Sequence, residues 1–213
     1  MINGIIFDLD GVLADTSSMW IGLYRNITHK VGISRTLSDD EITKNFGEKY
    51  ELVLEGLVGK ANMGRALPML ENKIYSEDWL NSLKPTPHSP EVLERLGKIG
   101  LKMAVVSGNK SDILHKILKS LGFENYFQTT VGADQVRKAK PDPESLLKAI
   151  SVLNLKKSEV IFIGDATNDV KAARAAGIRV GVVLTGALKE KKAKELEPDW
   201  ILPDLSKLLN ILK

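Results

Sequence analysis

The chain has 213 residues, of which 43% are hydrophobic and 27% are charged. These fractions are typical of soluble globular proteins and exclude disordered, collagen-like and disulfide-stapled chains. The 30 basic and 27 acidic residues give a formal net charge of +3, which does not indicate a nucleic-acid or membrane partner. Because cysteine is absent, thiolate nucleophiles and cysteine zinc sites are excluded, and the chemistry must come from carboxylates, hydroxyls and lysines.

The N-terminal segment MINGIIFDLDGVLAD has neither the basic region nor the long apolar core of a signal peptide. No stretch of the sequence approaches the roughly 18 uncharged apolar residues that a membrane-spanning helix needs. We therefore expect a cytoplasmic protein.

Short apolar runs alternate with amphipathic stretches over most of the chain, which is typical of βα units that build a parallel sheet. The first run, Ile2–Phe7, predicts a buried strand. We expect an α/β fold with a doubly wound, Rossmann-like parallel sheet. The remaining strands are predicted at Lys102–Ser107, Thr129–Gly132, Val160–Gly164 and Arg179–Leu184, and the helices at Pro90–Ile99, Ser111–Leu121, Pro143–Leu153 and Asp169–Ala176.

The segment from residue 15 to residue 85 differs, because it has helical periodicity throughout and no strand-like run. It begins with the polar residues Asp15-Thr16-Ser17 and is followed by closely spaced prolines at positions 85, 87 and 90, a stiff connection typical of a domain boundary. We predict an α/β core made of residues 1–14 and 86–213, with a small helical domain inserted over residues 15–85.

Two aspartates follow the first predicted strand. Asp8 and Asp10 are two positions apart, so their side chains point the same way at the strand end and can converge on one site. Such a pair can hold a hard cation and leave one oxygen for chemistry. The structural alternative is that Asp10 and Gly11 form a turn, with Asp8 as a cap.

Three further polar motifs follow predicted strands or precede helices. Ser107-Gly108-Asn109 offers a hydroxyl and backbone N–H groups to an anion, although the same residues also make ordinary loops. Lys140 could neutralise a phosphate or be a solvated loop lysine. Asp165 would complete an oxygen-rich magnesium site, whereas Asp169 could simply cap a helix. Ligands of open parallel sheets bind at the carboxyl ends of strands, where all these motifs are placed.

Together, FDLDGVLAD, VVSGNKS, AKPDPESLLKAI and IGDATNDVKAARAAG resemble, in order, the four motifs of the haloacid dehalogenase superfamily of aspartate-nucleophile hydrolases. The helical insertion resembles the small cap domain of the branch that contains phosphoglycolate phosphatase and β-phosphoglucomutase. The resemblance covers essentially the whole chain. It implies a Rossmann-like core, a magnesium cofactor and a small phosphorylated metabolite as substrate.

The resemblance also implies a role for each motif residue. Asp8 would attack phosphorus to form a phosphoaspartyl intermediate, while Asp10 would protonate the leaving alcohol and later deprotonate water. A Mg²⁺ ion held by Asp8, the backbone carbonyl of Asp10 and Asp165 would screen the charges, with Asp169 orienting its ligands. The residues that would hold and stabilise the phosphoryl group are Ser107, Gly108, Asn109 and Lys140.

The predicted substrate is a small phosphate ester. Relatives that cleave carbon–halogen bonds or phosphonates generally lack an aspartate at the position of Asp10. Lys49, in the loop 46–49, is the best candidate in the cap for contact with an anionic substrate, although a solvated lysine is the alternative. Together with the resemblance to the phosphoglycolate phosphatase branch, Lys49 makes phosphoglycolate the leading candidate. We expect a monomer or homodimer without nucleic-acid or membrane partners.

Two other functions are weighed against hydrolysis. DGVLADT resembles the first motif of the mutases, but those enzymes carry a cap histidine where this chain has Trp20, which would be a pocket floor or a packed core residue. A receiver-like signalling module would also hold a phosphoaspartate on a doubly wound sheet. The helical insertion and Asp10 argue against that module, because a switch without turnover needs neither.

Overall fold

The computed structural model describes residues 1–212, which form a six-stranded parallel sheet with the strand order β3-β2-β1-β4-β5-β6. The central strand β1 (Gly4–Phe7) pairs with β2 (Lys102–Val106) on one side and with β4 (Val160–Gly164) on the other. The predicted doubly wound α/β fold is therefore confirmed. The outer strands are β3 (Thr129–Val131), β5 (Arg179–Val183) and β6 (Trp200–Leu202), of which β6 was not predicted.

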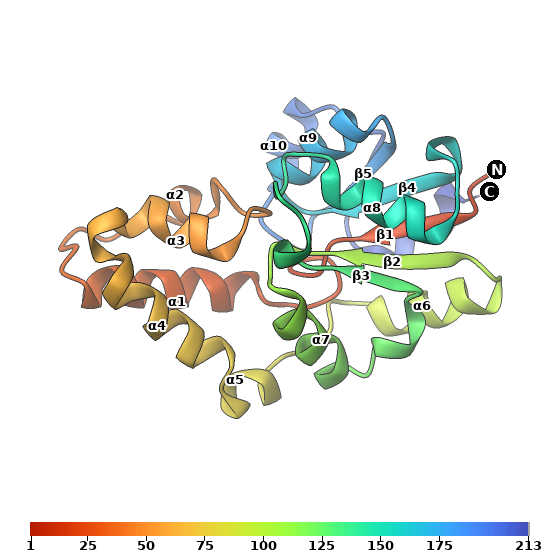
Figure 1. Ribbon diagram of the computed structural model, residues 1–213. Helices are drawn as coiled ribbons and strands as arrows, with labels where there is room; N and C mark the ends of the chain where they lie inside the picture. Colours follow the sequence, from red (N-terminus) through yellow and green to blue (C-terminus); the bar gives the residue numbers. More distant parts are fainter. Residues whose placement is uncertain (213) are drawn as a thin grey trace.

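Helices cover both faces of the sheet (Figure 1). Successive side chains of a strand point to opposite faces, so Ile5 and Phe7 pack in one hydrophobic cluster and Ile6 in the other. The first cluster includes side chains of α6 (Ser89–Lys98) and α7 (Ser111–Ser120). The helices that pack in the second are α8 (Glu144–Leu153), α9 (Thr167–Ala176) and α10 (Glu190–Glu195). Short 3₁₀ helices complete the core at Glu124–Tyr126, Ala133–Gln135, Lys157–Glu159 and Leu205–Ile211.

A separate group of helices lies beyond the carboxyl ends of the strands, and the N-terminus lies at the opposite end of the sheet (Figure 1). The buried side chains of this group of helices include Tyr24, Ile27, Leu54 and Leu70, each at most 2% exposed. The helices are α1 (Ser17–Lys30), α2 (Asp39–Thr43), α3 (Tyr50–Val58), the 3₁₀ turn Lys60–Asn62, α4 (Met63–Ile74) and α5 (Glu77–Asn81). We call residues 15–85 the helical segment.

The chain leaves the sheet and returns to it at neighbouring points. The Asp15 amide donates to the Lys84 carbonyl at 2.9 Å, and the Thr86 amide donates to the Leu13 carbonyl at 2.9 Å. The two connections to the helical segment therefore run side by side.

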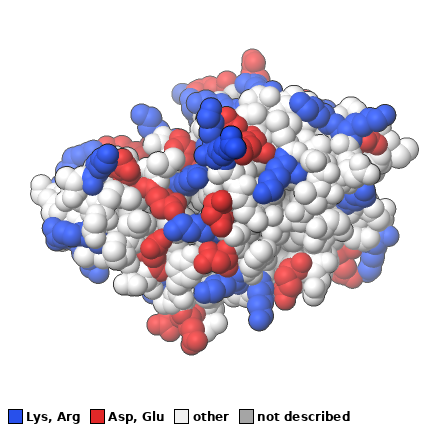
Figure 2. All heavy atoms as spheres, viewed as in Figure 1, with Lys and Arg blue, Asp and Glu red and all other residues white. Residues whose placement is uncertain are grey.

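The surface carries both signs of charge. On the face shown in Figure 2, acidic and basic side chains are interspersed over the sheet region and the helical segment. Over residues 1–212, the structure contains no helix with the length and hydropathy required to span a bilayer.

Candidate active site

The polar motifs meet where the three central strands end. Asp8, Ser107 and Asp165 directly follow β1, β2 and β4, and each is at most 4% exposed. Because these strands are hydrogen-bonded neighbours and parallel, their carboxyl ends share one edge of the sheet. Lys140 arrives from the loop before α8, and its Nζ lies 3.0 Å from Asp8 Oδ1 and 2.6 Å from Asp169 Oδ1.

Three buried carboxylates form a cluster that fits a metal ion. Asp8, Asp165 and Asp169 each place an oxygen within 4.8 Å of the others. Burial raises the pKa of Asp8 to about 7 against the opposing effect of Lys140, and burial together with Asp169 and Asp8 holds the pKa of Asp165 well above its usual value. Both shifts come mainly from the cost of burying a negative charge, to which the neighbouring carboxylates add and which Lys140 offsets only in part. A hard dication with oxygen ligands, such as Mg²⁺, would relieve it, so the residues present fit that ion.

Glycines shape the space around Asp165. Its Oδ2 accepts a hydrogen bond from the Ala187 amide at 2.7 Å. A Cβ atom at Gly186 would lie 1.9 Å from this oxygen, and one at Gly11, whose φ is +71°, would lie 2.4 Å from it. Any side chain at either position would displace the carboxylate. Gly186 was missed by sequence reasoning because its requirement comes from a residue of a different strand end.

Asp169 is held by donors on both oxygens. Oδ1 accepts from Lys140 Nζ, and Oδ2 accepts from the backbone amides of Asp165 and Ala166 at 3.0 and 2.9 Å. The carboxylate therefore fixes both the lysine and the loop that carries Asp165. The role that the resemblance implies for Asp169, orienting the ligands of a metal ion, stays a prediction.

The Asp10 side chain is held by three donors. Oδ1 accepts from Thr16 Oγ1 at 2.6 Å and from Trp20 Nε1 at 2.8 Å, and Oδ2 accepts from Asn109 Nδ2 at 2.7 Å. Burial raises the pKa of Asp10 above its usual value, although the three donors oppose the shift. Thr16 and Trp20 belong to the helical segment, so this segment positions a carboxyl group of the core. Sequence reasoning did not find either contact.

The predicted phosphate-binding loop lies against the helical segment. Ser107 Oγ accepts from the Asn109 amide at 3.1 Å, which fixes the turn at Gly108. A Cβ atom at Gly108 would lie 2.0 Å from the carbonyl oxygen of Glu48. The same loop of the helical segment is held from the other side, where Asn168 Nδ2 donates to the Phe46 carbonyl at 3.1 Å. The helical segment is therefore closed over the strand ends.

A cavity of about 40 Å³ remains between the two parts. At roughly 10–15 Å³ for each water, it would hold about three water molecules. Its lining from the described residues does not include Lys49, whose neighbours Glu48 and Tyr50 both contribute. The core contributes Asp8, Asp10, Gly108, Asn109 and Asp165, and the helical segment contributes Trp20, Tyr24, Phe46, Gly47, Glu48, Tyr50 and Val53.

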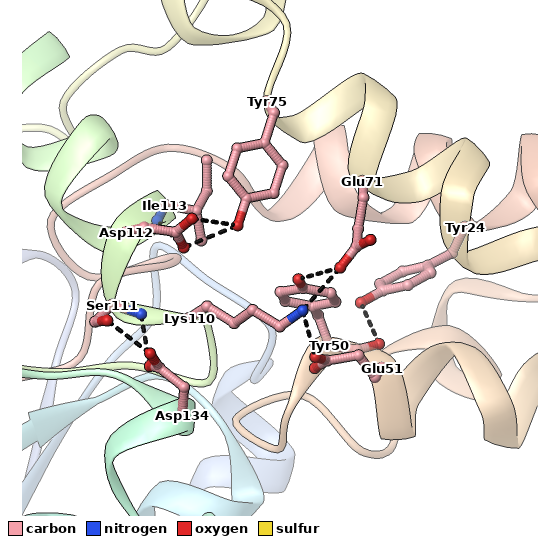
Figure 3. A network of polar contacts seen from close by, with 10 residues as sticks. All are labelled: Tyr24, Tyr50, Glu51, Glu71, Tyr75, Lys110, Ser111, Asp112, Ile113 and Asp134. Carbon is pink, nitrogen blue, oxygen red and sulfur yellow. Dashed lines mark hydrogen bonds and ion pairs between the residues drawn. The ribbon is translucent and has the colours of Figure 1, made fainter.

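Charged side chains join the helical segment to the core beside this cavity (Figure 3). Lys110 Nζ lies 2.8 Å from Glu71 Oε1, 3.2 Å from Glu51 Oε1 and 5.4 Å from the centre of the Tyr50 ring. Lys110 directly follows Asn109, which binds Asp10. Lys110, which pairs with the helical segment, is therefore the sequence neighbour of Asn109, which donates to Asp10 in the candidate site.

Comparisons with known proteins identify the family of this chain. The sequence pattern of the haloacid dehalogenase-like hydrolases matches residues 5–183. Pyrophosphatase PpaX of Listeria monocytogenes serotype 4a is 29% identical, with 100% of this chain and 97% of that protein covered. Phosphoglycolate phosphatase of Aquifex aeolicus is also 29% identical, with 98% and 95% covered. A solved hydrolase from Pseudomonas syringae superposes with a TM-score of 0.86 at 26% identity, with 99% and 97% covered. By its matching pattern, its fold and its strand-end carboxylates, the chain belongs to the haloacid dehalogenase-like hydrolase family.

Proposed function

We propose that this hydrolase is a magnesium-dependent phosphatase of small phosphorylated metabolites that works through a phosphoaspartyl intermediate. The observation that carries the proposal is the buried group of Asp8, Lys140 and Asp165, with the separately held carboxyl group of Asp10 lining the same cavity. Relatives of nearly the same length are named a pyrophosphatase and a phosphoglycolate phosphatase, which supports chemistry at phosphorus.

In the first step, an oxygen of Asp8 attacks phosphorus and the bond from phosphorus to the ester oxygen breaks. Asp10 gives its proton to that departing oxygen, so the leaving group is released as an alcohol. Lys140 and the turn at Gly108 hold the phosphoryl oxygens while the charge moves. Mg²⁺, when bound through Asp8, the backbone carbonyl of Asp10 and Asp165, supplies screening between the attacking carboxylate and the phosphate dianion.

In the second step, a water molecule attacks the phosphorus of the phosphoaspartate. Asp10, now ionised, takes a proton from this water, and the bond between phosphorus and Asp8 breaks. Inorganic phosphate leaves, and both carboxyl groups return to their starting states. The three donors that hold Asp10 fix its position for both proton transfers.

The helical segment serves as the cap in this proposal. Its closed position limits water beside Asp8 to the few molecules that the cavity can hold, and it brings Thr16 and Trp20 to Asp10. Phosphoglycolate remains the substrate that Lys49 favours. The carboxylate of phosphoglycolate would meet Lys49 only if the loop 46–49 turned the lysine side chain into the cavity.

Magnesium titration tests the proposal. Release of phosphate from p-nitrophenyl phosphate should require Mg²⁺, and Asp165→Asn should raise the Mg²⁺ concentration for half-maximal rate at least about tenfold, because one charged ligand is lost. Calorimetric titration of Mg²⁺ should show the same loss of affinity without turnover. The control is Asp78→Asn, which removes an exposed carboxylate of α5.

An unchanged magnesium titration would remove Asp165 from the metal site. If no ester released phosphate in the presence of Mg²⁺, the phosphatase proposal itself would fail. Released phosphate also separates hydrolysis from the two alternatives, because a mutase or a receiver-like module keeps the phosphoryl group on the substrate or on the protein.

Loss of the Lys110 contacts is expected to weaken substrate binding. Lys110→Met should raise KM about three- to tenfold and change kcat less, because partly exposed ion pairs contribute up to about 1 kcal/mol each and help to hold the cap closed. The effect should shrink in high salt, which screens such pairs. Lys119→Met, an exposed lysine on the same helix, is the matched control. Equal KM values for both variants in low salt would show that these contacts do not support closure.

A further inference from the structure

The wall that the helical segment contributes to the cavity is mainly aromatic. The Trp20 ring stacks on the rings of Tyr24 and Tyr50, with centroids 5.5 and 6.3 Å apart, and packs edge-on against Trp79. Phe46 extends this wall beside Tyr24. Since Asp8 and the phosphate-binding turn lie on the core side of the cavity, the leaving group of a bound ester would face this aromatic wall.

Glu48 is the one charged side chain that the helical segment adds to this lining, within residues 1–212. Its Oε1 has a single long contact, 3.4 Å from Asn168 Nδ2, and no ion pair holds it among the residues that the structure describes. Burial raises the pKa of Glu48, and Asn168 and Lys171 offset this only in part. The cavity thus contains a carboxylate that forms no ion pair with the described residues and that Lys171 compensates only in part.

No lysine or arginine of the described chain lines the cavity. Lys140 pairs with Asp8 and Asp169 and is assigned above to the phosphoryl group, not to the leaving group, and Lys110 is engaged by Glu51 and Glu71. An anionic leaving group would therefore be repelled by Glu48, whose charge Lys171 offsets only in part, at a cost in binding. A cationic one would satisfy this carboxylate and could also lie over the aromatic rings.

We propose that the preferred substrate is a small amino-alcohol phosphate, whose leaving group carries an ammonium ion that Glu48 and the aromatic wall bind. This proposal rests on the phosphatase function proposed above and adds the class of leaving group. Glu48 is in this view the specificity-determining residue.

Three esters of similar size test the effect of the charge on the leaving group. They are 2-aminoethyl phosphate, with a cationic leaving group, propyl phosphate, with a neutral one, and phosphoglycolate, with an anionic one. We expect kcat/KM for the aminoethyl ester to exceed that for the neutral propyl ester at least about tenfold, with phosphoglycolate lowest. Glu48→Gln keeps an acceptor for Asn168 but loses the charge. It should lower kcat/KM for the aminoethyl ester about tenfold more than for the propyl ester.

The control is Glu55→Gln, which removes a carboxylate of the same region of the cap, on α3 and outside the cavity lining. It should leave the ratio between the two esters unchanged. Equilibrium binding of the same esters to Asp8→Asn protein should give the same order without turnover, so slow chemistry cannot hide the preference.

A propyl ester used as well as the aminoethyl ester, or an equal loss for both in Glu48→Gln, would overturn the proposal while the phosphatase function stood. A preference for phosphoglycolate that Lys49→Ala abolishes would overturn it in favour of Lys49. If neither turnover nor binding of any ester, including p-nitrophenyl phosphate, were found, the phosphatase function would fail together with it.

Discussion

Replacing Asp8 with Asn is expected to lower kcat for every ester about 10³-fold or more while the fold stays intact. The amide keeps the size of the side chain but is a far weaker nucleophile than the carboxylate. Without the carboxylate, no phosphoaspartate should form, so acid-quenched protein examined by mass spectrometry should carry phosphate only in the parent. The melting temperature in metal-free buffer should be unchanged or higher, because burial already disfavours the charge at this position.

Asp8→Glu provides the matched comparison, because it retains a carboxylate and displaces it by one methylene group. Kinetics of both variants with p-nitrophenyl phosphate separate the need for the charged oxygen from the need for its position. Substantial turnover by Asp8→Asn, with Asp10 untouched, would show that another group attacks phosphorus.

Replacing Lys140 with Met is expected to affect both stability and catalysis. The ammonium group is 2% exposed and lies between Asp8 and Asp169. Burial opposes its charge, but the two carboxylates outweigh burial and raise the pKa of Lys140 above its usual value. Removing it leaves two buried carboxylates without a cation, at a cost of about 3–5 kcal/mol in metal-free protein. Loss of positive charge near the transferring phosphoryl group should lower kcat about 10²–10³-fold.

Urea unfolding with and without Mg²⁺ measures the first effect, and the destabilisation should be smaller when the metal is present. Lys138→Met is the control, since this exposed lysine lies two positions earlier in the same loop and should change stability by less than about 0.5 kcal/mol. Equal stabilities of the two variants in metal-free buffer would mean that Lys140 does not compensate the buried carboxylates.

The three central strands could be predicted because each is a mainly apolar run that a polar residue follows directly. Val160–Gly164, for example, is buried at every position and is followed by Asp165. Partial burial at the sheet edge does not explain why β6 was missed, because β3 at the other edge has the same length and the same burial pattern and was predicted. The difference lies in composition: all three residues of β3 (Thr129, Thr130 and Val131) are β-branched, whereas Ile201 is the one β-branched residue of β6.

The candidate site was predicted less completely, because several of its contacts depend on how the helical segment packs. Asp8, Asp10 and Asp165 stand out by their place after strands, and the structure brings them together; their individual roles stay predictions. The contacts of Asp10 with Thr16 and Trp20 arise only once α1 lies over the strand ends. No local pattern encodes them.

Lys49 illustrates the same limit within one loop. The sequence identifies the loop 46–49, and its charge favours Lys49 for substrate contact. In the structure Lys49 has an extended backbone, with φ −58° and ψ 132°, so its neighbours Glu48 and Tyr50 share the side that lines the cavity. Charge alone could not decide which of the adjacent residues faces inward, and contact between Lys49 and substrate stays a prediction.

The paired connections of the helical segment have a consequence for how such proteins diversify. Ala14 and Pro85 form an antiparallel bridge, so residues 15–85 start and finish at nearly the same place on the sheet. A stretch with adjacent ends can be enlarged, shortened or exchanged without breaking the strand pairing of the rest. The core residues proposed to act on phosphorus and the residues of the helical segment proposed to select the leaving group are therefore encoded in separate stretches of the gene. Selection can change the second set while the first is kept.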